Sequence, residues 1–434
     1  MMESRSLVRE AETLLQQGRK GDAQALLRQA AAAGNEAADA LQLLSRLAFQ
    51  DRSFQEAQDL LRQVLAIDPD RHICHFELGG IELEQGRFET ALAHFETADA
   101  LMPDHAVVML HKALVLEKLD RAYDAAVTYK RCWANALDHG KQLSRLPLPL
   151  QRLMAHGRAL IAGQLDELFN QALAEVRSTF GHKDLQRVER LIAVILGKAP
   201  PEKMPPLQRP GGLFFPGLPE RKFFEREMFP WIEDVESQAA LVRDEYLALA
   251  EDESFFRPYV NVDEKSEGVE HWKGVNKSLS WSSCHVYRHG KLREDVASRC
   301  PVTIATLDKA PLNRVVDHGP ESMFSVLKPG THIPPHHGTI NGRLIVHLPL
   351  IVPENCGAIR VAGEVRTWEF GRCLIFDDSY AHEAWNHCAE TRVVLIFDIW
   401  SPYLTDIEIA AYSRVIEVVD RLNVDAFGEA FFRE

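Results

Sequence analysis

Residues 323–352, MFSVLKPGTHIPPHHGTINGRLIVHLPLIV, decide the fold of the C-terminal half of this 434-residue chain. Two apolar runs rich in Val, Ile, Leu and Phe flank a middle rich in Pro and Gly, which is typical of β-strands joined by turns. Further runs of this kind follow: GAIRVAG, VRTWEFGRCLIFDD, HEAWNH and TRVVLIFDIW. Many short strands without long helices between them predict a double-stranded β-helix (jelly-roll or cupin-like) rather than a parallel α/β sheet.

Two histidines of this half, His336 and His382, are spaced so that they can meet at one mouth of such a barrel. Imidazole nitrogen suits iron, and a site with few protein ligands leaves positions open for substrate and oxygen. Gly338, two residues after His336, offers no carboxylate. Asp377 and Asp378 are candidates for a third ligand, but Asp-Asp before a Ser-Tyr turn more often bonds backbone amides. For any single histidine, a structural role is the alternative.

Arg392 begins the apolar run RVVLIFDIW. An arginine that enters a barrel strand needs a partner, because an unpaired buried charge is very costly. A dicarboxylic cosubstrate would supply that partner through a two-pronged ion pair that lysine does not match. The alternative is a surface arginine at the edge of the strand.

The N-terminal part of the chain is repetitive. Four alanines recur at a constant interval of 34 residues: Ala23, Ala57, Ala91 and Ala125. Pro69 and Pro103 fall at the same point of successive units, where proline ends a helix. This period resembles the tetratricopeptide repeat, and it predicts an all-α solenoid over residues 1–138 that binds an extended peptide or another protein. An ordinary helical bundle is the alternative.

The remaining boundaries follow from composition. Residues 139–198 continue as helix without a repeat and are expected to extend or cap the solenoid. Residues 199–219, dense in proline and glycine, are expected to form a linker, because these residues sustain neither helix nor central strand. The double-stranded β-helix domain is expected over residues 220–404, and a C-terminal helix over residues 405–434.

Composition limits the classes of partner. The net charge of -14 disfavours nucleic acid and anionic membrane surfaces as partners. The seven cysteines are scattered without a CxxC pair, which indicates reduced thiols. The first residues, MMESRSLVREAETLL, show no basic segment followed by an apolar core. We therefore expect a cytoplasmic protein without a membrane partner.

Several motifs resemble the aspartyl/asparaginyl β-hydroxylase family over roughly residues 212–403. They are FFPGLPERKFF, PGTHIPPHHG, LIFDDSYAHEAWN and RVVLIFDIWSP. The resemblance implies a dioxygenase that binds Fe(II) and uses 2-oxoglutarate and O2. It implies that His336 and His382 bind the metal, and that Arg392 and Ser325 hold the distal carboxylate of 2-oxoglutarate. His347 matches a histidine near the metal-chelating end of the cosubstrate.

The resemblance also shows two departures. Gly338 stands where the related, membrane-anchored lipid-A hydroxylases keep an aspartate, so it favours the β-hydroxylase branch. Ile345 stands where the animal enzymes carry an arginine that contacts the acidic side chain of the substrate. Arg343 is two residues away on the same strand and therefore points to the same face, so it is the candidate substrate-binding residue.

The expected activity is hydroxylation of an amino-acid side chain, at a carbon like the β-carbon of Asp or Asn, in a peptide or protein recruited by the repeats. One alternative is a hydroxylase of a free amino acid or small peptide metabolite. Another is a non-catalytic binding or scaffold protein whose repeats are active and whose jelly roll is degenerate.

Overall fold

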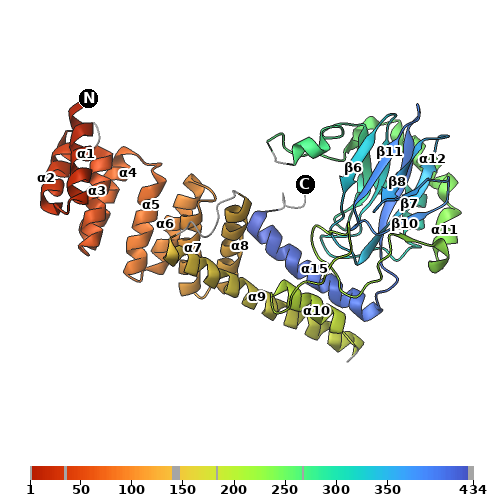
Figure 1. The fold of residues 1–434 in the computed structure, drawn as a ribbon, viewed down its shortest axis with the longest axis horizontal. Coiled ribbons are helices and arrows are strands. Elements are labelled where there is room, and N and C mark those ends of the chain that lie inside the picture. The colour runs from red at the N-terminus through yellow and green to blue at the C-terminus, as the bar shows by residue number, and fades with distance from the viewer. Residues whose placement is uncertain (1, 34–36, 139–146, 182–183, 266–267, 429–434) are drawn as a thin grey trace. The chain divides into compact units, whose positions relative to one another are not determined.

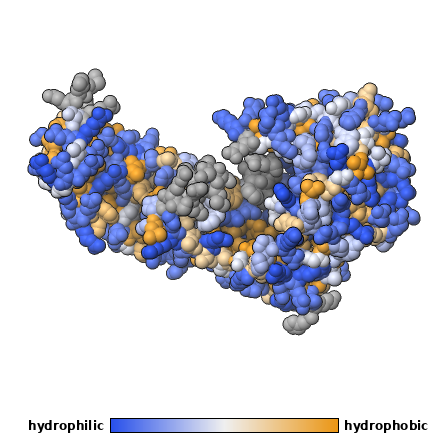
Figure 2. Space-filling model, viewed as in Figure 1, coloured by the Kyte–Doolittle hydropathy of each residue, from blue (hydrophilic) through white to orange (hydrophobic). Residues whose placement is uncertain are grey.

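The structure is a computed structural model that describes residues 2–33, 37–138, 147–181, 184–265 and 268–428. It divides into two compact units, residues 1–164 with 425–427 and residues 165–424 with 428–434. Each unit is considered by itself. The face drawn in Figure 2 is mainly hydrophilic on both units, with apolar side chains in scattered groups.

The N-terminal unit is built from helices that pack in consecutive pairs (Figure 1). In chain order they are α1 (Met2–Gln16), α2 (Lys20–Ala32), α3 (Ala37–Gln50), α4 (Phe54–Ile67), α5 (His72–Glu84), α6 (Phe88–Leu101), α7 (Ala106–Lys118) and α8 (Ala122–Asp138). The four alanines of the 34-residue period lie in the second helix of each pair and are fully buried. A small side chain at these points lets the paired helices approach closely. The predicted helical repeat region is confirmed.

Two further helices follow, α9 (Leu148–Phe180) and α10 (Gln186–Ile195). The division between the two compact units falls within α9. The domain limits inferred from the sequence therefore remain predictions. Across the described residues, every helix is too short or too polar to cross a lipid bilayer.

The described strands of the C-terminal unit form two antiparallel sheets (Figure 1). The larger sheet has the order β1-β10-β7-β12-β5-β3-β2, with β4 paired to β3, and the smaller has the order β6-β11-β8-β9. The strands are β1 (Phe223–Phe224), β2 (Arg257–Pro258), β3 (Trp281–Arg288), β4 (Lys291–Leu292), β5 (Ser322–Leu327), β6 (His332–His336), β7 (Arg343–Ile351), β8 (Gly357–Val361), β9 (Glu364–Arg366), β10 (Leu374–Phe376), β11 (His382–Asn386) and β12 (Arg392–Trp400). An antiparallel β domain after the helical region confirms the predicted fold class.

Both faces of the larger sheet are buried. Side chains alternate along each strand, so every strand contributes residues to the core on each face. On β12, Leu395 and Phe397 pack in one core with the helices α11 (Ile232–Glu236), α12 (Ala239–Ala250) and α14 (Pro301–Leu307). Val394 points to the opposite face and shares a second core with Ile333 of the smaller sheet. Arg392 has the parity of Val394, so its side chain lies on the face that the smaller sheet covers.

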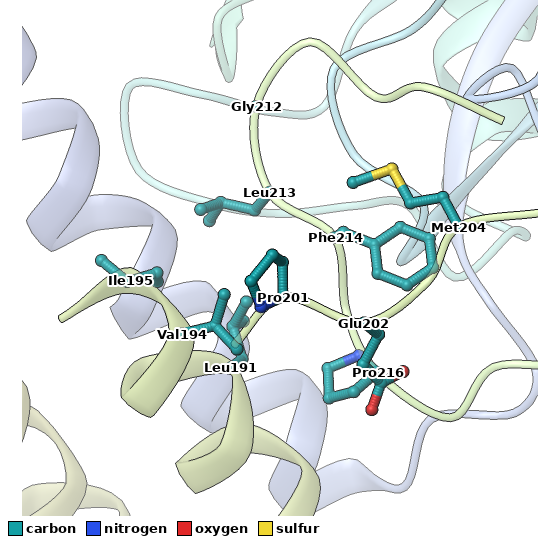
Figure 3. Close-up of a pocket in the computed structure, with 10 residues that line it drawn as sticks. All are labelled: Leu191, Val194, Ile195, Pro201, Glu202, Met204, Gly212, Leu213, Phe214 and Pro216. Carbon is teal, nitrogen blue, oxygen red and sulfur yellow. The ribbon is translucent and has the colours of Figure 1, made fainter. Parts of the chain in front are cut away.

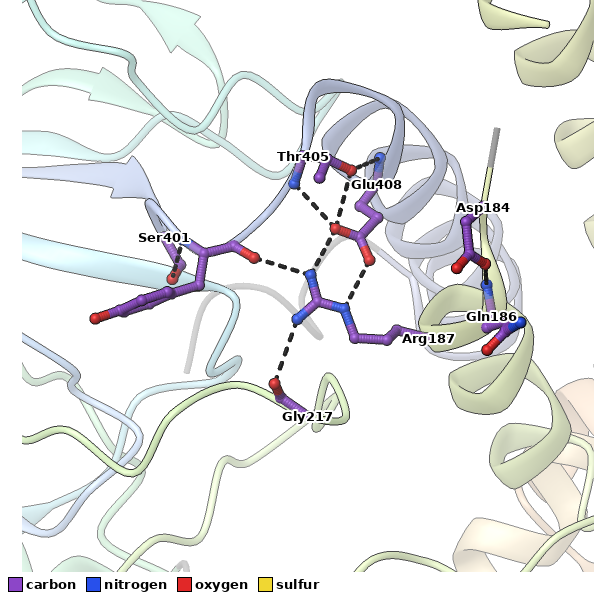
Figure 4. A network of polar contacts seen from close by, with 8 residues as sticks. Asp184, Gln186, Arg187, Gly217, Ser401, Thr405 and Glu408 are labelled. Atoms are coloured by element: carbon purple, nitrogen blue, oxygen red, sulfur yellow. Dashed lines mark hydrogen bonds and ion pairs between the residues drawn. The ribbon is translucent and has the colours of Figure 1, made fainter. Parts of the chain in front are cut away.

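A partly buried ion pair joins α10 to the C-terminal helix α15 (Asp406–Phe427) (Figure 4). Arg187 donates from Nε and Nη2 to the two carboxylate oxygens of Glu408, at 2.7 and 2.6 Å. Its Nη2 also donates to the Tyr403 carbonyl at 2.8 Å. Glu408 forms a capping box with Thr405 at the start of α15. One carboxylate therefore caps a helix and docks another at the same time.

Candidate active site

His336 and His382 lie side by side at the ends of two neighbouring strands. β6 and β11 are antiparallel, and their register pairs His336 directly with His382. The two imidazole rings are 4.0 Å apart between centroids. The structure thus brings together the two histidines that the sequence singled out.

Both imidazoles are held in one orientation by their own strands. Nδ1 of His336 donates to the Pro334 carbonyl at 2.9 Å, and Nδ1 of His382 donates to the Tyr380 carbonyl at 3.0 Å. Each Nε2 therefore keeps its lone pair, which is the arrangement of metal-binding histidines. Burial, with a smaller effect of the neighbouring imidazole, lowers the pKa of His336 to about 3, and burial lowers the pKa of His382 to about 4. Both rings are neutral at physiological pH, as metal coordination requires.

The position two residues after His336 is closed to any side chain. A Cβ built on Gly338 would lie 2.1 Å from Oδ2 of Asp378. The Asp378 carboxylate thus occupies the space that a ligand at position 338 would need. Within the described residues no group of three or more His, Cys, Asp or Glu side chains is placed to hold an ion. A metal bound here would have the two histidines as its protein ligands.

The two neighbouring aspartates have different roles. Asp377 forms the turn expected from the sequence, because its Oδ1 accepts from the Ser379 backbone N–H at 2.9 Å. Asp378 instead accepts from Nη2 of Arg343 at 3.3 Å, while its Oδ1 is buried without a hydrogen-bond partner among the described residues. Sequence reasoning missed this second role. The glycine at position 338 was the one sequence feature that could have indicated it, since the Asp378 carboxylate fills the space that a side chain at position 338 would take.

Arg392 is buried without an acidic partner. Its side chain is among the largest that are fully buried, and none of the described carboxylates lies within ion-pair distance of it. Nη1 donates to the Ser325 carbonyl at 3.4 Å, the guanidinium lies 4.6 Å from the centre of the Trp368 ring, and Nε has no hydrogen-bond partner in the part of the chain that the structure describes. Burial lowers the pKa of Arg392 to about 10. A buried guanidinium that is still charged and lacks a counter-ion fits an anionic ligand.

Ser325 and His347 lie on the same face of the larger sheet as Arg392. Ser325 is paired with Val394 of β12, and its hydroxyl accepts a hydrogen bond from Trp281 Nε1 at 3.4 Å. His347 accepts from Trp368 Nε1 at 3.2 Å through Nδ1. Its ring also contacts Phe376, which in turn contacts His382, with centroids 5.1 and 5.6 Å apart.

Three tryptophans pack against these polar side chains, and the sequence analysis did not assign them to the site. Trp281 and Trp272 lie 5.9 and 5.5 Å from the His336 ring between centroids. Trp368 covers Arg392 and orients His347. Nothing in their local sequence distinguishes these residues from ordinary core aromatics. Their placement depends on which strands pair.

Arg343, the candidate substrate residue, is held between two buried aspartates. Nη1 donates to Oδ2 of Asp398 at 3.2 Å, and Nη2 donates to Oδ2 of Asp378 at 3.3 Å. Burial alone would lower the pKa of Arg343, but the two carboxylates outweigh it and the pKa is raised. The guanidinium is therefore charged and already matched by anions.

An apolar pocket lies away from this chemistry (Figure 3). It has a volume of about 140 Å³ between α10 and the chain around residues 201–216. Leu191, Val194 and Phe214 are among its lining residues, and Glu202 carries its charge. None of the predicted site residues lines it.

Two family models match parts of this chain. Residues 236–402 match the family model for aspartyl/asparaginyl beta-hydroxylase, and residues 8–72 and 43–106 match the tetratricopeptide repeat. The chain is 35% identical over 176 residues to the human aspartyl/asparaginyl beta-hydroxylase, which covers 40% of this chain and 21% of that protein.

Two other relatives have different names. The ornithine lipid ester-linked acyl 2-hydroxylase of Rhizobium tropici is 35% identical over 181 residues, covering 41% of this chain and 60% of that protein. Human aspartate beta-hydroxylase domain-containing protein 2 is 33% identical over 205 residues, which cover 46% of this chain and 52% of that protein. The chain thus spans between 21% and 60% of the length of these three relatives. Residues 236–402 are thus similar to the aspartyl/asparaginyl beta-hydroxylase family, and the part of the chain before them is similar to tetratricopeptide repeats.

Proposed function

We propose that this protein is an Fe(II)- and 2-oxoglutarate-dependent dioxygenase that hydroxylates an amino-acid side chain in a peptide or protein. The observation that carries the proposal is the pair His336 and His382, neutral and in contact, with both Nε2 atoms left free by Nδ1 hydrogen bonds. The buried Arg392 supports it, because a cation without a counter-ion calls for an anionic cosubstrate.

Each site residue has a separate role in this proposal. His336 and His382 would hold Fe(II) through Nε2, while Arg392 and Ser325 would hold the distal carboxylate of 2-oxoglutarate. Bound together, the iron and the cosubstrate supply the oxidising power that inserts one oxygen atom of O2 into a C–H bond, with release of succinate and CO2. The protein's own part is to bind, orient and exclude water.

His347 has a defined part in that orientation. Because Trp368 Nε1 donates to its Nδ1, the proton of the neutral imidazole is on Nε2. Burial, followed by the charge of Arg392, lowers the pKa of His347 well below its usual value, so the ring stays neutral. The Nε2–H group is then a fixed donor for a carboxylate oxygen of the cosubstrate. This fits the place that the resemblance gives to His347, near the chelating end.

The tetratricopeptide repeats indicate interaction with a protein or peptide. We propose that they recruit the substrate. A comparison of peptide hydroxylation with and without residues 1–138 tests this role, provided that the shortened chain is first shown to fold. Equal rates for peptides of all lengths would favour the alternative of a free amino acid or small metabolite as substrate.

Anaerobic titration tests the assignment of iron and cosubstrate. Addition of Fe(II) and 2-oxoglutarate is expected to give a visible metal-to-ligand charge-transfer band, and His336→Ala is expected to abolish it. His332→Ala is the matched control, since His332 lies on the same strand but is exposed and paired with Glu383. A protein that folds but gives no band, and releases no succinate with any substrate, would instead support the non-catalytic scaffold.

A further inference from the structure

The inner face of the larger sheet has a second polar region, at the other end of the strands from Arg392. In β7, Arg343 and Ile345 share one face, and the register places Ile345 opposite Asp398 of β12. Glu321 directly precedes β5, and its backbone N–H donates to Oδ1 of Asp398 at 3.0 Å. Arg343, Ile345, Asp398 and Glu321 therefore lie together at this end of the barrel.

This end holds more negative than positive side chains. Arg343 already binds Asp398 and Asp378, whose side chains are 0% and 7% exposed. One oxygen of Asp378, Oδ1, is buried and still has no partner among the described residues. An acidic substrate side chain placed here would add a further carboxylate around one guanidinium. Ile345 supplies no second cation to receive it.

Glu321 is the carboxylate of this group that a ligand can reach. Its side chain is 24% exposed, against 7% and 0% for the two aspartates. The groups that face it are His285, Arg288 and His289 from β3 and the turn after it, together with Asp398 and Arg343.

Most of these neighbours do not neutralise Glu321. Burial lowers the pKa of His285 to about 3 and also lowers the pKa of His289, so both rings are neutral. Burial, with Asp398 nearby, raises the pKa of Glu321 itself to about 7. A cation that binds beside it would favour the ionised carboxylate.

One aromatic residue reaches this region. Tyr259 is 41% exposed, and its hydroxyl interacts electrostatically with Glu321 and Asp378. Its ring stacks on Trp281 with centroids 4.2 Å apart and planes 28° apart, whereas Trp281 itself belongs to the Arg392 end, because both Trp281 and Arg392 pair with Leu327 of β5. Rings beside carboxylates are a common way to bind ammonium and guanidinium groups.

We propose that this end of the barrel receives a cationic group of the substrate, bound by the Glu321 carboxylate with the Tyr259 ring beside it. The inference rests on the proposed function and narrows its substrate class to basic rather than acidic side chains. Arg343 then stabilises the wall of the site by joining Asp378 to Asp398, and Glu321 sets the charge preference.

The test is a titration of the full-length protein, with Fe(II) and 2-oxoglutarate under anaerobic conditions and again without metal. The probes are Nα-acetyl-arginine amide and its neutral isostere, the citrulline amide, followed through tryptophan fluorescence. We expect the arginine probe to bind about tenfold more tightly than the citrulline probe. The aspartate amide should bind less well than the asparagine amide.

Two variants and one control sharpen the test. Glu321→Gln is expected to bring the arginine-to-citrulline ratio close to one, whereas Glu354→Gln, in an exposed loop between β7 and β8, should keep it. Ile345→Arg is expected to reverse the preference between the aspartate and asparagine amides. Equal or undetectable binding of the arginine and citrulline probes, or a preference for the aspartate probe in the parent protein, would overturn the inference.

The two proposals fail differently. Loss of the charge-transfer band with Fe(II) and 2-oxoglutarate would remove the proposed function, whatever the probes do. A normal band without a preference for the arginine probe would remove only the assignment of the cationic substrate group.

Discussion

Arg392 and Arg343 are two buried arginines on adjacent strands of one sheet, and they lie in opposite electrostatic surroundings. Arg343 is matched by two carboxylates, which raise its pKa. Arg392 has a carbonyl and an aromatic ring but no carboxylate among the described residues, and burial lowers its pKa to about 10. The protein supplies the counter-ions of Arg343, and we propose that a ligand supplies the counter-ion of Arg392. Burial alone therefore does not distinguish a structural arginine from a binding one, but the inventory of its partners does.

The largest expected effect is on stability, from removal of the matched arginine. Arg343→Met leaves Asp378 and Asp398 buried without their cation, and we expect the free energy of unfolding to fall by about 4 kcal/mol. Chemical denaturation of the metal-free protein measures it. Adding Asp398→Asn to the same chain should restore part of the loss. If Arg343→Met alone is as stable as the parent, the two arginines do not differ in the way described here.

The unmatched arginine should show the opposite pattern. Arg392→Met is expected to weaken 2-oxoglutarate binding by at least about 100-fold, because it removes the buried cation that we propose binds the distal carboxylate. The thermal stability of the protein without cosubstrate should stay the same or rise, since the substitution removes a charge that is buried away from water. Calorimetric titration of the Fe(II)-loaded protein measures the first effect, and thermal unfolding without ligand measures the second. Arg360→Met, at an exposed ion pair with Glu383, is the control and should change neither.

Arg187 is intermediate, because its pair with Glu408 is only partly buried. Arg187→Met removes two hydrogen bonds to a carboxylate whose side chain is 7% exposed, and it should cost about 2 kcal/mol of stability. Arg414→Met, which breaks a more exposed pair with Glu175, should cost less than about 1 kcal/mol. Equal losses in the two variants would mean that burial does not set the strength of these pairs.

The smallest expected effect concerns pH. Glu321 has a folded pKa of about 7, above the usual value for glutamate, so the native state holds a proton that the unfolded chain releases. The free energy of unfolding therefore falls as pH rises between about 4.5 and 7, and the penalty is complete above that range. Glu321→Gln cannot ionise, so it should be more stable than the parent by about 1 kcal/mol near pH 8 and show no gain near pH 4. A gain that is the same at both pH values would contradict the shifted pKa.

Local sequence predicted those parts of the molecule that depend on local pattern. The recurring Ala23 and Ala57 predict paired helices because a small residue is needed wherever two helices cross. Alternating apolar runs predict the strands. The residue pattern and the resemblance both indicated His336, His382 and Arg392, and the structure places the two histidines on neighbouring strands of the smaller sheet and Arg392 on β12 of the larger sheet.

The sequence did not predict the contacts between distant segments, because these contacts depend on which strands pair. Asp378 lies 40 positions beyond Gly338 in the chain, so its presence in that space follows only from the register of the sheets. The same holds for Arg343, whose partner Asp398 is on a strand far along the chain. From the sequence alone, an arginine on a barrel strand is equally open to a substrate and to an aspartate. Glu321 lies just outside a strand and carries no local signal.

The two histidine rings are each fixed by a carbonyl only two residues earlier in the same strand, at Pro334 and Tyr380. The orientation of both imidazoles, which we propose bind the metal, is thus encoded within two short peptide segments and does not depend on the residues at the far end of the barrel. If the proposed iron site is correct, the charged residues at that far end can change by evolution or mutagenesis without altering the orientation of the two imidazoles. Such independence would let one oxidising centre serve enzymes whose targets have opposite charge.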